Sequence, residues 1–220
     1  MPPLSRQSLS DQVYLSLRTA LLDGQYEPGE RLRVADIAAR MGTSSTPVRE
    51  AIQRLASEHA VEVTNATAIR VPTLDPAQLD EILSMRILLE GRAAELAARH
   101  VTPAELDELS RIQHEYARVA PVDSRMGSLR NREFHFALMR AARQPLLQRT
   151  VESLWVMMGP LVNEFHARTD PGYFISPEHN HFRILRALAA RDAEAAGQAM
   201  RNDLENARVM VTWAQERMAG

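Results

Sequence analysis

Apolar residues recur at helical spacing along most of this chain, and one short region near residue 60 follows a different pattern. The helical spacing predicts a first helix over residues 9–22, a second over 33–41 and a third over about 44–59. Two stretches of alternating character then follow, 60–64 and 68–72, and they predict a small β-hairpin. Three helices and a hairpin in this order are the outline of a winged helix-turn-helix.

The rest of the chain has the pattern of an all-helical domain. Thr102 and Glu105 form a capping-box start, and prolines or short polar breaks separate the other segments. The helices predicted here cover residues 79–100, 103–120, 128–142, 145–165, 178–190 and 193–218. We therefore expect a mainly α protein with two domains, a winged helix-turn-helix over 1–73 and an antiparallel bundle of about six helices over 74–220, with a linker at 73–78.

Composition narrows the class of protein. The 220 residues are 45% hydrophobic and 25% charged, as in ordinary globular proteins, and there is no cysteine to form disulfides or thiolate metal sites. No apolar run reaches the length of a membrane span, and the first ten residues lack a hydrophobic signal segment. We expect a cytoplasmic protein with no membrane partner. All 26 basic residues are arginine, and eight of them balance eight acidic residues within 1–72, so DNA binding depends on local placement.

The stretch from Asp36 to Leu55 carries the strongest functional signal. Gly42 suits the tight turn of a helix-turn-helix, and the small hydroxyl residues after it can cap the next helix and let its N-terminus approach bases and phosphates. Arg49 lies one turn into that helix, where it can reach a guanine edge or a phosphate. The DNA-contacting residues predicted by this interpretation are Arg33, Ser44, Ser45, Thr46, Pro47, Arg49, Arg54 and Asn65.

These residues also resemble a known family. The segment from Ala38 to Leu55, which contains Thr46-Pro47-Val48-Arg49-Glu50-Ala51-Ile52, is similar to the DNA-binding half of the GntR superfamily of bacterial regulators. The resemblance implies a homodimer that binds a two-fold-related operator in double-stranded DNA. Ser45 stands where the family commonly has arginine, and the hairpin tip at 65–67 lacks the usual glycine. Both departures lie in segments expected to contact DNA, so we expect them to affect which operator sequence the protein recognises.

The helical half resembles the FCD domain of the FadR branch of that superfamily. The matching segments are Glu81–Arg86, Leu89-Glu90, Ala93-Ala94, Asn131–His135, Pro145–Leu147, His181–Leu188, Arg191-Asp192 and Ala199-Met200. Many such domains hold a metal through one carboxylate and three histidines. Carried onto this sequence, the four positions are Asn131, His135, His181 and Asp203, so an amide replaces the usual carboxylate and a carboxylate replaces the third histidine.

The substituted set can still bind a metal. Asn131 and His135 are four residues apart, which puts them on one face of a helix. Two imidazoles and a carboxylate suit Zn, Ni, Mn or Fe(II), and each ligating imidazole should have a partner that fixes its tautomer. The alternative for His135 is a core histidine with no metal. His179, two residues from His181, is expected to point elsewhere, and the remaining histidines, His59, His100, His114 and His166, are expected at the surface.

Arg86 lies on an otherwise apolar helical stretch, and a buried arginine needs an anionic partner. Two interpretations remain open: Arg86 binds the carboxylate of an organic acid effector, or it forms an internal salt bridge with Glu90 one turn on.

The sequence therefore predicts a ligand-responsive DNA-binding regulator, a repressor or activator of a metabolic operon, whose effector is a small organic acid bound in the helical domain. An alternative from another class is a metal-dependent hydrolase or lyase that uses His135, His181 and Asp203. That enzyme would need a general base, and Glu133, close to His135 in sequence, is expected on a different face. A third possibility is a pure metal sensor.

Overall fold

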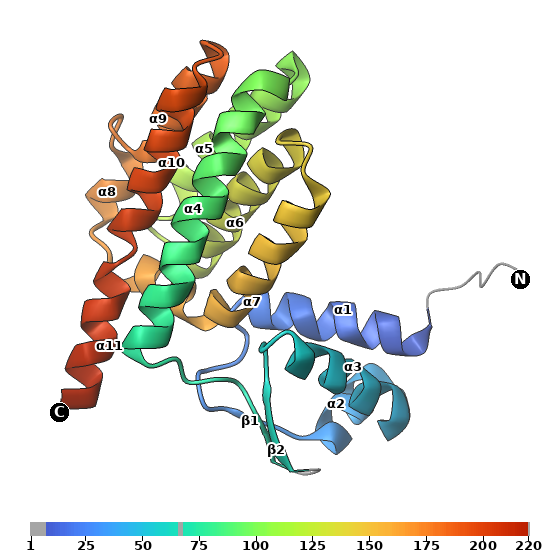
Figure 1. The fold of residues 1–220 in the computed structure, drawn as a ribbon. Helices are drawn as coiled ribbons and strands as arrows, with labels where there is room; N and C mark the ends of the chain where they lie inside the picture. The colour runs from blue at the N-terminus through green and yellow to red at the C-terminus, as the bar shows by residue number, and fades with distance from the viewer. Residues whose placement is uncertain (1–7, 66–67, 220) are drawn as a thin grey trace, which may run out of the picture. The chain divides into compact units, whose positions relative to one another are not determined.

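The computed structural model describes residues 8–65 and 68–219 (Figure 1). The chain divides into two compact units, one made of residues up to Thr73 together with Trp155–Pro160, the other of Leu74–Leu154 and the residues from Leu161 onward. Within the described residues, no helix combines the length and apolar character that a membrane span requires.

The first unit is a three-helix core with a small sheet. Its helices are α1 (Leu9–Leu22), α2 (Val34–Met41) and α3 (Ser45–Ser57), and its strands are β1 (Arg31–Leu32), β2 (Glu62–Asn65) and β3 (Ala68–Arg70). Ser8 begins α1 with a capping box, and one face of each helix is buried against the others. The three helices and the hairpin confirm the predicted winged helix-turn-helix.

The sheet contains one strand that the sequence did not predict. The strand order is β1-β3-β2, with both pairings antiparallel, and β1 pairs Leu32 with Ile69. A strand of two residues is too short to show the alternation of polar and apolar positions from which strands are recognised. The hairpin itself lies close to the predicted residues, and its tip at 66–67 falls outside the described residues.

The second unit is a helical bundle. Its long helices are α4 (Pro76–His100), α5 (Pro103–Val119), α6 (Ser124–Ala141), α9 (Asn180–Ala189) and α10 (Ala193–Asn206), with short α8 (Pro171–Ile175) and terminal α11 (Val209–Ala219). Helix α7 (Pro145–Arg168) also belongs to it except for Trp155–Pro160, which group with the first unit. Helix α4 packs along α10 and also contacts α6, α9 and α11, while α5 packs against α6 and α9. The mainly α class and the bundle of about six helices are confirmed (Figure 1).

Several predicted boundaries were wrong for identifiable reasons. Helix α4 begins at Pro76, inside the predicted linker, because Asp75 caps it and proline suits the first turn. Helix α6 begins four residues earlier than predicted, where Asp123 accepts a hydrogen bond from the Met126 amide. The predicted last helix ends at Asn206 and resumes as α11, and the predicted break at 169–177 contains α8.

Candidate functional site

Helix α3 presents one apolar face and one polar face. The apolar face is fully buried and consists of Val48, Ala51, Ile52 and Leu55. The other face and the helix start are exposed, and they carry Ser44, Ser45, Thr46 and Arg49, whereas Pro47 is half-buried. Because the buried face fixes how the helix is rotated, these polar residues are held at the surface of the unit.

The turn before α3 is built on Gly42. This glycine ends α2 in the left-handed conformation, with φ of 62°, which a side chain disfavours. The next helix begins at Ser44, but the Ser44 side chain makes no capping hydrogen bond, contrary to the capping expected from the sequence. The first amides of α3 therefore lack a side-chain cap from Ser44, which leaves this helix N-terminus suited to a phosphate.

Arg54 lies further along α3 and is held by α1. Its guanidinium is 2.5 Å from an Asp11 carboxylate oxygen and stacks over the Tyr14 ring at 3.9 Å. The Tyr14 hydroxyl in turn donates to Glu58 at 2.6 Å. The side chain predicted to meet the DNA backbone thus fastens α3 to α1 in this structure. Of the remaining predicted contacts, Arg33 is exposed just before α2, and Asn65 ends β2 with a side chain outside the described part of the chain.

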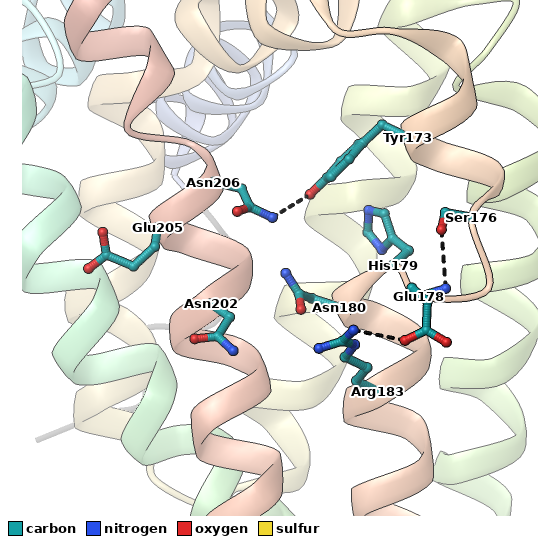
Figure 2. A pocket seen from close by; sticks show the side chains of 9 residues that line it. All are labelled: Tyr173, Ser176, Glu178, His179, Asn180, Arg183, Asn202, Glu205 and Asn206. Carbon is teal, nitrogen blue, oxygen red and sulfur yellow. Dashed lines mark hydrogen bonds and ion pairs between the residues drawn. The ribbon is translucent and has the colours of Figure 1, made fainter.

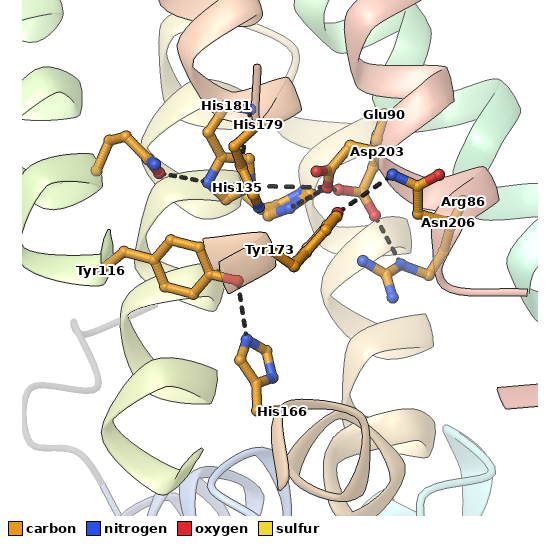
Figure 3. A network of polar contacts seen from close by, with 11 residues as sticks. Arg86, Glu90, Tyr116, His135, His166, Tyr173, His179, His181, Asp203 and Asn206 are labelled. Carbon is orange, nitrogen blue, oxygen red and sulfur yellow. Dashed lines mark hydrogen bonds and ion pairs between the residues drawn. The ribbon is translucent and has the colours of Figure 1, made fainter. Parts of the chain in front are cut away.

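A second site lies buried in the bundle, where three of the predicted metal ligands meet (Figure 3). Helix α6 brings His135, α9 brings His181 and α10 brings Asp203, and one ligand atom from each lies within 4.8 Å of the others. The Nε2 atoms of His135 and His181 are 3.4 and 3.6 Å from the same Asp203 oxygen. Both imidazoles are almost completely buried.

Each imidazole is oriented by a buried partner at its other nitrogen. His135 donates from Nδ1 to Glu90 at 2.6 Å, and His181 donates from Nδ1 to the side-chain oxygen of Gln113 at 2.6 Å. The donated protons direct both Nε2 atoms toward Asp203. Among the described residues, the Nε2 atom of His181 is buried and has no hydrogen-bond partner. An unsatisfied nitrogen beside an imidazole and a carboxylate is a donor set that could hold a divalent metal.

Burial and charge set the protonation of the cluster. Burial lowers the pKa of His181 and outweighs the opposing effect of Asp203. Burial would raise the pKa of Asp203, but His181 and His135 hold it well below its ordinary value. Burial would also lower the pKa of His135, yet Glu90 and Asp203 outweigh it and the pKa rises. A neutral His181 and an ionised Asp203 are the forms that ligate metals.

Asn131, the fourth predicted position, lies on α6 one turn before His135. It is half-buried. The structure therefore brings together three of the four predicted ligands and places Asn131 on the same helix as one of them.

Arg86 is 2% exposed and forms an ion pair with Glu90, which is fully buried, at 2.7 Å. This is the internal salt bridge that the sequence left open. The pair also connects to the cluster, because the second oxygen of Glu90 accepts the His135 hydrogen bond. Glu90 therefore carries one charge that serves both Arg86 and His135.

Two further histidines are buried near the cluster, and one of them, His166, was placed wrongly from the sequence. His166, expected at the surface, is 3% exposed, donates from Nδ1 to the Val162 carbonyl at 2.8 Å and accepts from the Tyr116 hydroxyl at 3.2 Å. Burial lowers its pKa to about 4. His179 is not among the clustered ligand candidates, as predicted, although it is 4% exposed and its ring centre lies 4.7 Å from that of His181. It precedes α9 as the N-cap, so helical spacing does not govern its direction. His59, His100 and His114 are exposed.

The partners Glu90 and Gln113 were not identified as site residues from the sequence. A signal for Gln113 was present, because it shares the apolar stripe of α5 with Leu109, Ile112 and Tyr116 and is itself fully buried. A buried amide on such a stripe needs a polar partner. Glu133, the acid considered for a hydrolase, is paired with Arg130 at 2.5 Å and does not join the cluster.

Comparison with known proteins gives matches to both halves of the chain. The family model described as "Bacterial regulatory proteins, gntR family" matches residues 9–71, and the model described as "FCD domain" matches residues 81–206. The HTH-type transcriptional regulator McbR of Escherichia coli is 35% identical over 188 residues, which cover 85% of each chain. The Exu regulon transcriptional regulator of Escherichia coli is 30% identical, over 92% of this chain and 84% of that protein.

Solved structures agree with these matches. The structure of Escherichia coli McbR/YncC superposes with a TM-score of 0.85 at 32% identity and covers 94% of this chain and 98% of its own. A GntR transcriptional regulator from Rhodococcus sp. RHA1 gives a TM-score of 0.73 at 26% identity, over 92% of this chain and 97% of that one. Both comparisons extend over nearly the whole chain.

Proposed function

The chain belongs to the GntR family of bacterial transcription regulators, in the group with a C-terminal FCD domain, and we propose that it is a metal-dependent, ligand-responsive repressor of a metabolic operon. Membership of this family makes it a DNA-binding regulator and not an enzyme. One relative, 30% identical over 200 residues, is named as the probable D-xylose utilization operon transcriptional repressor of Paenarthrobacter nicotinovorans, which supports both a metabolic operon and repression.

The buried cluster carries this proposal. His135, His181 and Asp203 would hold one divalent ion of Zn, Ni, Mn or Fe(II), and Asn131 could add a weak oxygen ligand. The ion would supply a positive charge with open positions for the carboxylate of a small organic acid. Glu90 and Gln113 keep both imidazoles in the tautomer that presents Nε2, and Arg86 holds Glu90 in place. A pure metal sensor would use the same ligands without an acid.

Operator binding follows from α3. Its uncapped start and exposed Arg49 would enter the major groove, and a homodimer would present two such helices to two half-sites. An arginine at such a position either contacts a phosphate, which fixes the orientation of the protein on DNA, or reads a guanine. Because the basic and acidic residues of this unit balance, electrostatic attraction to DNA is weak and a second half-site should be important for affinity. An effector would change DNA binding only by favouring one arrangement of the dimer over the other.

The decisive experiment replaces both imidazoles. The double variant His135→Ala/His181→Ala should lose the bound metal, from one ion per subunit to none, and should lose the response to effector while it keeps basal operator binding. Metal content after dialysis against trace zinc, nickel and manganese measures the first effect, and gel shifts measure the second. The matched control is His100→Ala/His114→Ala, in which two exposed histidines are removed.

Retention of metal by the double variant, or absence of metal in the parent protein, would contradict the proposed metal site.

Sedimentation of the full chain at micromolar concentration tests the dimer. A monomer would contradict the proposed binding of two operator half-sites by two copies of α3.

A further inference from the structure

A pocket of about 390 Å³ opens between α8, α9 and α10, beside the buried cluster (Figure 2). Its wall includes His179 and Asn180, which directly precede His181, and Asn202, which directly precedes Asp203. The metal-ligand candidates themselves are not part of the wall. The pocket therefore adjoins the cluster, and its wall shares α9 and α10 with it.

The chemistry of the wall is uniform. Every side chain that lines the pocket carries a hydrogen-bonding group, and none is aliphatic. Ligand pockets are usually lined mainly by apolar and aromatic side chains, with few polar groups among them. The polar atoms here include three carboxamides, those of Asn180, Asn202 and Asn206, and each carboxamide can both donate and accept.

The charged groups of the wall are already paired. Arg183 binds Glu178 at 2.8 Å, and Glu205 binds Arg208 at 2.6 Å. The cationic side chain of the pocket wall, Arg183, is therefore already paired with a carboxylate and is not available to bind an acid. What the wall offers is a set of neutral donors and acceptors, and these match hydroxyl groups, which also donate and accept.

One donor of the wall has no acceptor. The Nδ1 atom of His179 accepts a hydrogen bond from the His181 amide at 3.2 Å, so the proton of this imidazole is on Nε2. That Nε2 atom is buried and has no hydrogen-bond partner within the described residues. In Figure 2 the His179 ring points toward Tyr173, whose hydroxyl accepts from Asn206 at 3.2 Å. A ligand oxygen near Tyr173 would satisfy a donor that is otherwise costly to bury.

We propose that this pocket binds a small molecule with several adjacent hydroxyl groups, and that His179 is the residue that determines this specificity. The inference rests on the proposed function, because it assumes that the helical domain senses a ligand. The hydroxyl groups belong to a neutral sugar or to a sugar acid. In the second case the carboxylate reaches the metal site and the hydroxyls occupy the pocket. An unsubstituted fatty acid leaves the buried polar atoms of the wall unpaired.

The test uses the full-length protein and a panel of pentoses, hexoses and their sugar acids, with hexanoate as the six-carbon acid without hydroxyls. Thermal shift and calorimetry should detect binding of at least one hydroxylated compound and none of hexanoate. A sugar acid that binds only to metal-loaded protein assigns its carboxylate to the metal, whereas equal binding of the neutral sugar assigns recognition to the pocket alone.

Two variants examine the wall. His179→Phe keeps an aromatic ring but removes the donor, and it should weaken binding about tenfold or more, as expected for a lost buried hydrogen bond. Asn202 is half-buried on α10, and Asn202→Ala should weaken binding as well. This variant tests whether the wall binds the ligand if His179→Phe does not fold. His100→Phe, on an exposed histidine of α4, is the matched control and should bind like the parent.

Hexanoate binding as strong as that of the hydroxylated compounds, or no binding by any of them, overturns the proposal. Parent-like affinity in both wall variants also overturns it. Metal content and operator affinity are measured on the same preparations. If metal content and operator affinity are intact but no hydroxylated compound binds, the pocket proposal is refuted and the proposed function stands. If hydroxylated compounds bind to a protein that holds no metal, the metal-dependent function is refuted and the pocket proposal stands.

Discussion

The two candidate sites of this protein differ in how they treat polar groups. The start of α3 exposes its polar side chains, and Ser44 leaves the first amides of the helix without a side-chain cap. The cluster around His135 buries its polar groups, and Glu90 and Gln113 fix the imidazoles from behind. Water can satisfy the polar groups of an exposed site at little cost, whereas a buried polar group is costly unless it has a partner. In the cluster, Glu90 and Gln113 are partners of the two Nδ1 atoms, and the buried Nε2 atom of His181 has none among the described residues.

The two sites also differ in how they are assembled from the chain. The DNA-reading residues are neighbours in sequence, on a turn and the first turns of one helix. The cluster draws His135, His181 and Asp203 from three helices, with Glu90 from a fourth. Substitutions in the cluster should therefore affect folding as well as ligand binding, while substitutions of the exposed residues at the start of α3 should affect DNA binding alone.

The largest effect is expected for Glu90→Gln. The change removes the buried charge that pairs with Arg86 at 2.7 Å and accepts the His135 hydrogen bond. Breaking a buried ion pair in this way costs about 3–5 kcal/mol of the free energy of unfolding. Urea unfolding monitored by circular dichroism measures the loss, and metal content should fall because His135 loses its orienting carboxylate.

The control for this variant is Glu108→Gln, since Glu108 and Arg140 form an exposed pair at 3.7 Å that should contribute little. Equal stability of Glu90→Gln and the parent would show that the buried network is not needed for folding, and the contrast between the two sites would fail.

Arg49→Ala should have a smaller effect, and one confined to DNA. Loss of a good base contact costs about 1–3 kcal/mol of operator affinity, with the unfolding free energy unchanged. A gel shift at fixed salt measures the change. Arg54→Ala is the matched comparison on the same helix, because Asp11 and Tyr14 hold that side chain. It should reduce operator affinity less than Arg49→Ala, and an equal or greater loss would assign Arg54 to the DNA contact predicted from the sequence.

The smallest effect is expected at the turn. Gly42→Ala places a Cβ on a residue with φ of 62° and should cost about 1 kcal/mol of stability through backbone strain, because no neighbouring atom lies within 4 Å of that Cβ. Gly42→Asn should cost less, since asparagine tolerates this conformation. Thermal unfolding of the two variants ranks them. A Gly42→Ala variant as stable as the parent would mean that the turn has another conformation.

The sequence determined the features that depend on local pattern. Helical spacing, caps and the glycine turn were enough to predict the three-helix core, the hairpin and the bundle, because each of these is encoded by residues a few positions apart. The four metal-ligand positions came from a family resemblance, and the structure brings three of them together. The sequence left two partners open for Arg86, an effector carboxylate and Glu90, because it does not show which anionic group lies beside a buried side chain.

Only the tertiary structure decided the surroundings of these residues. It brought Gln113 of α5 against His181 of α9, buried His166 beside Tyr116, and turned His179 toward the pocket beside the cluster. Each of these contacts joins helices that are distant in sequence, or depends on a residue just outside a helix. The spacing of residues along the chain specifies which face of a helix is apolar, but the polar partners of a buried side chain depend on which helices pack together.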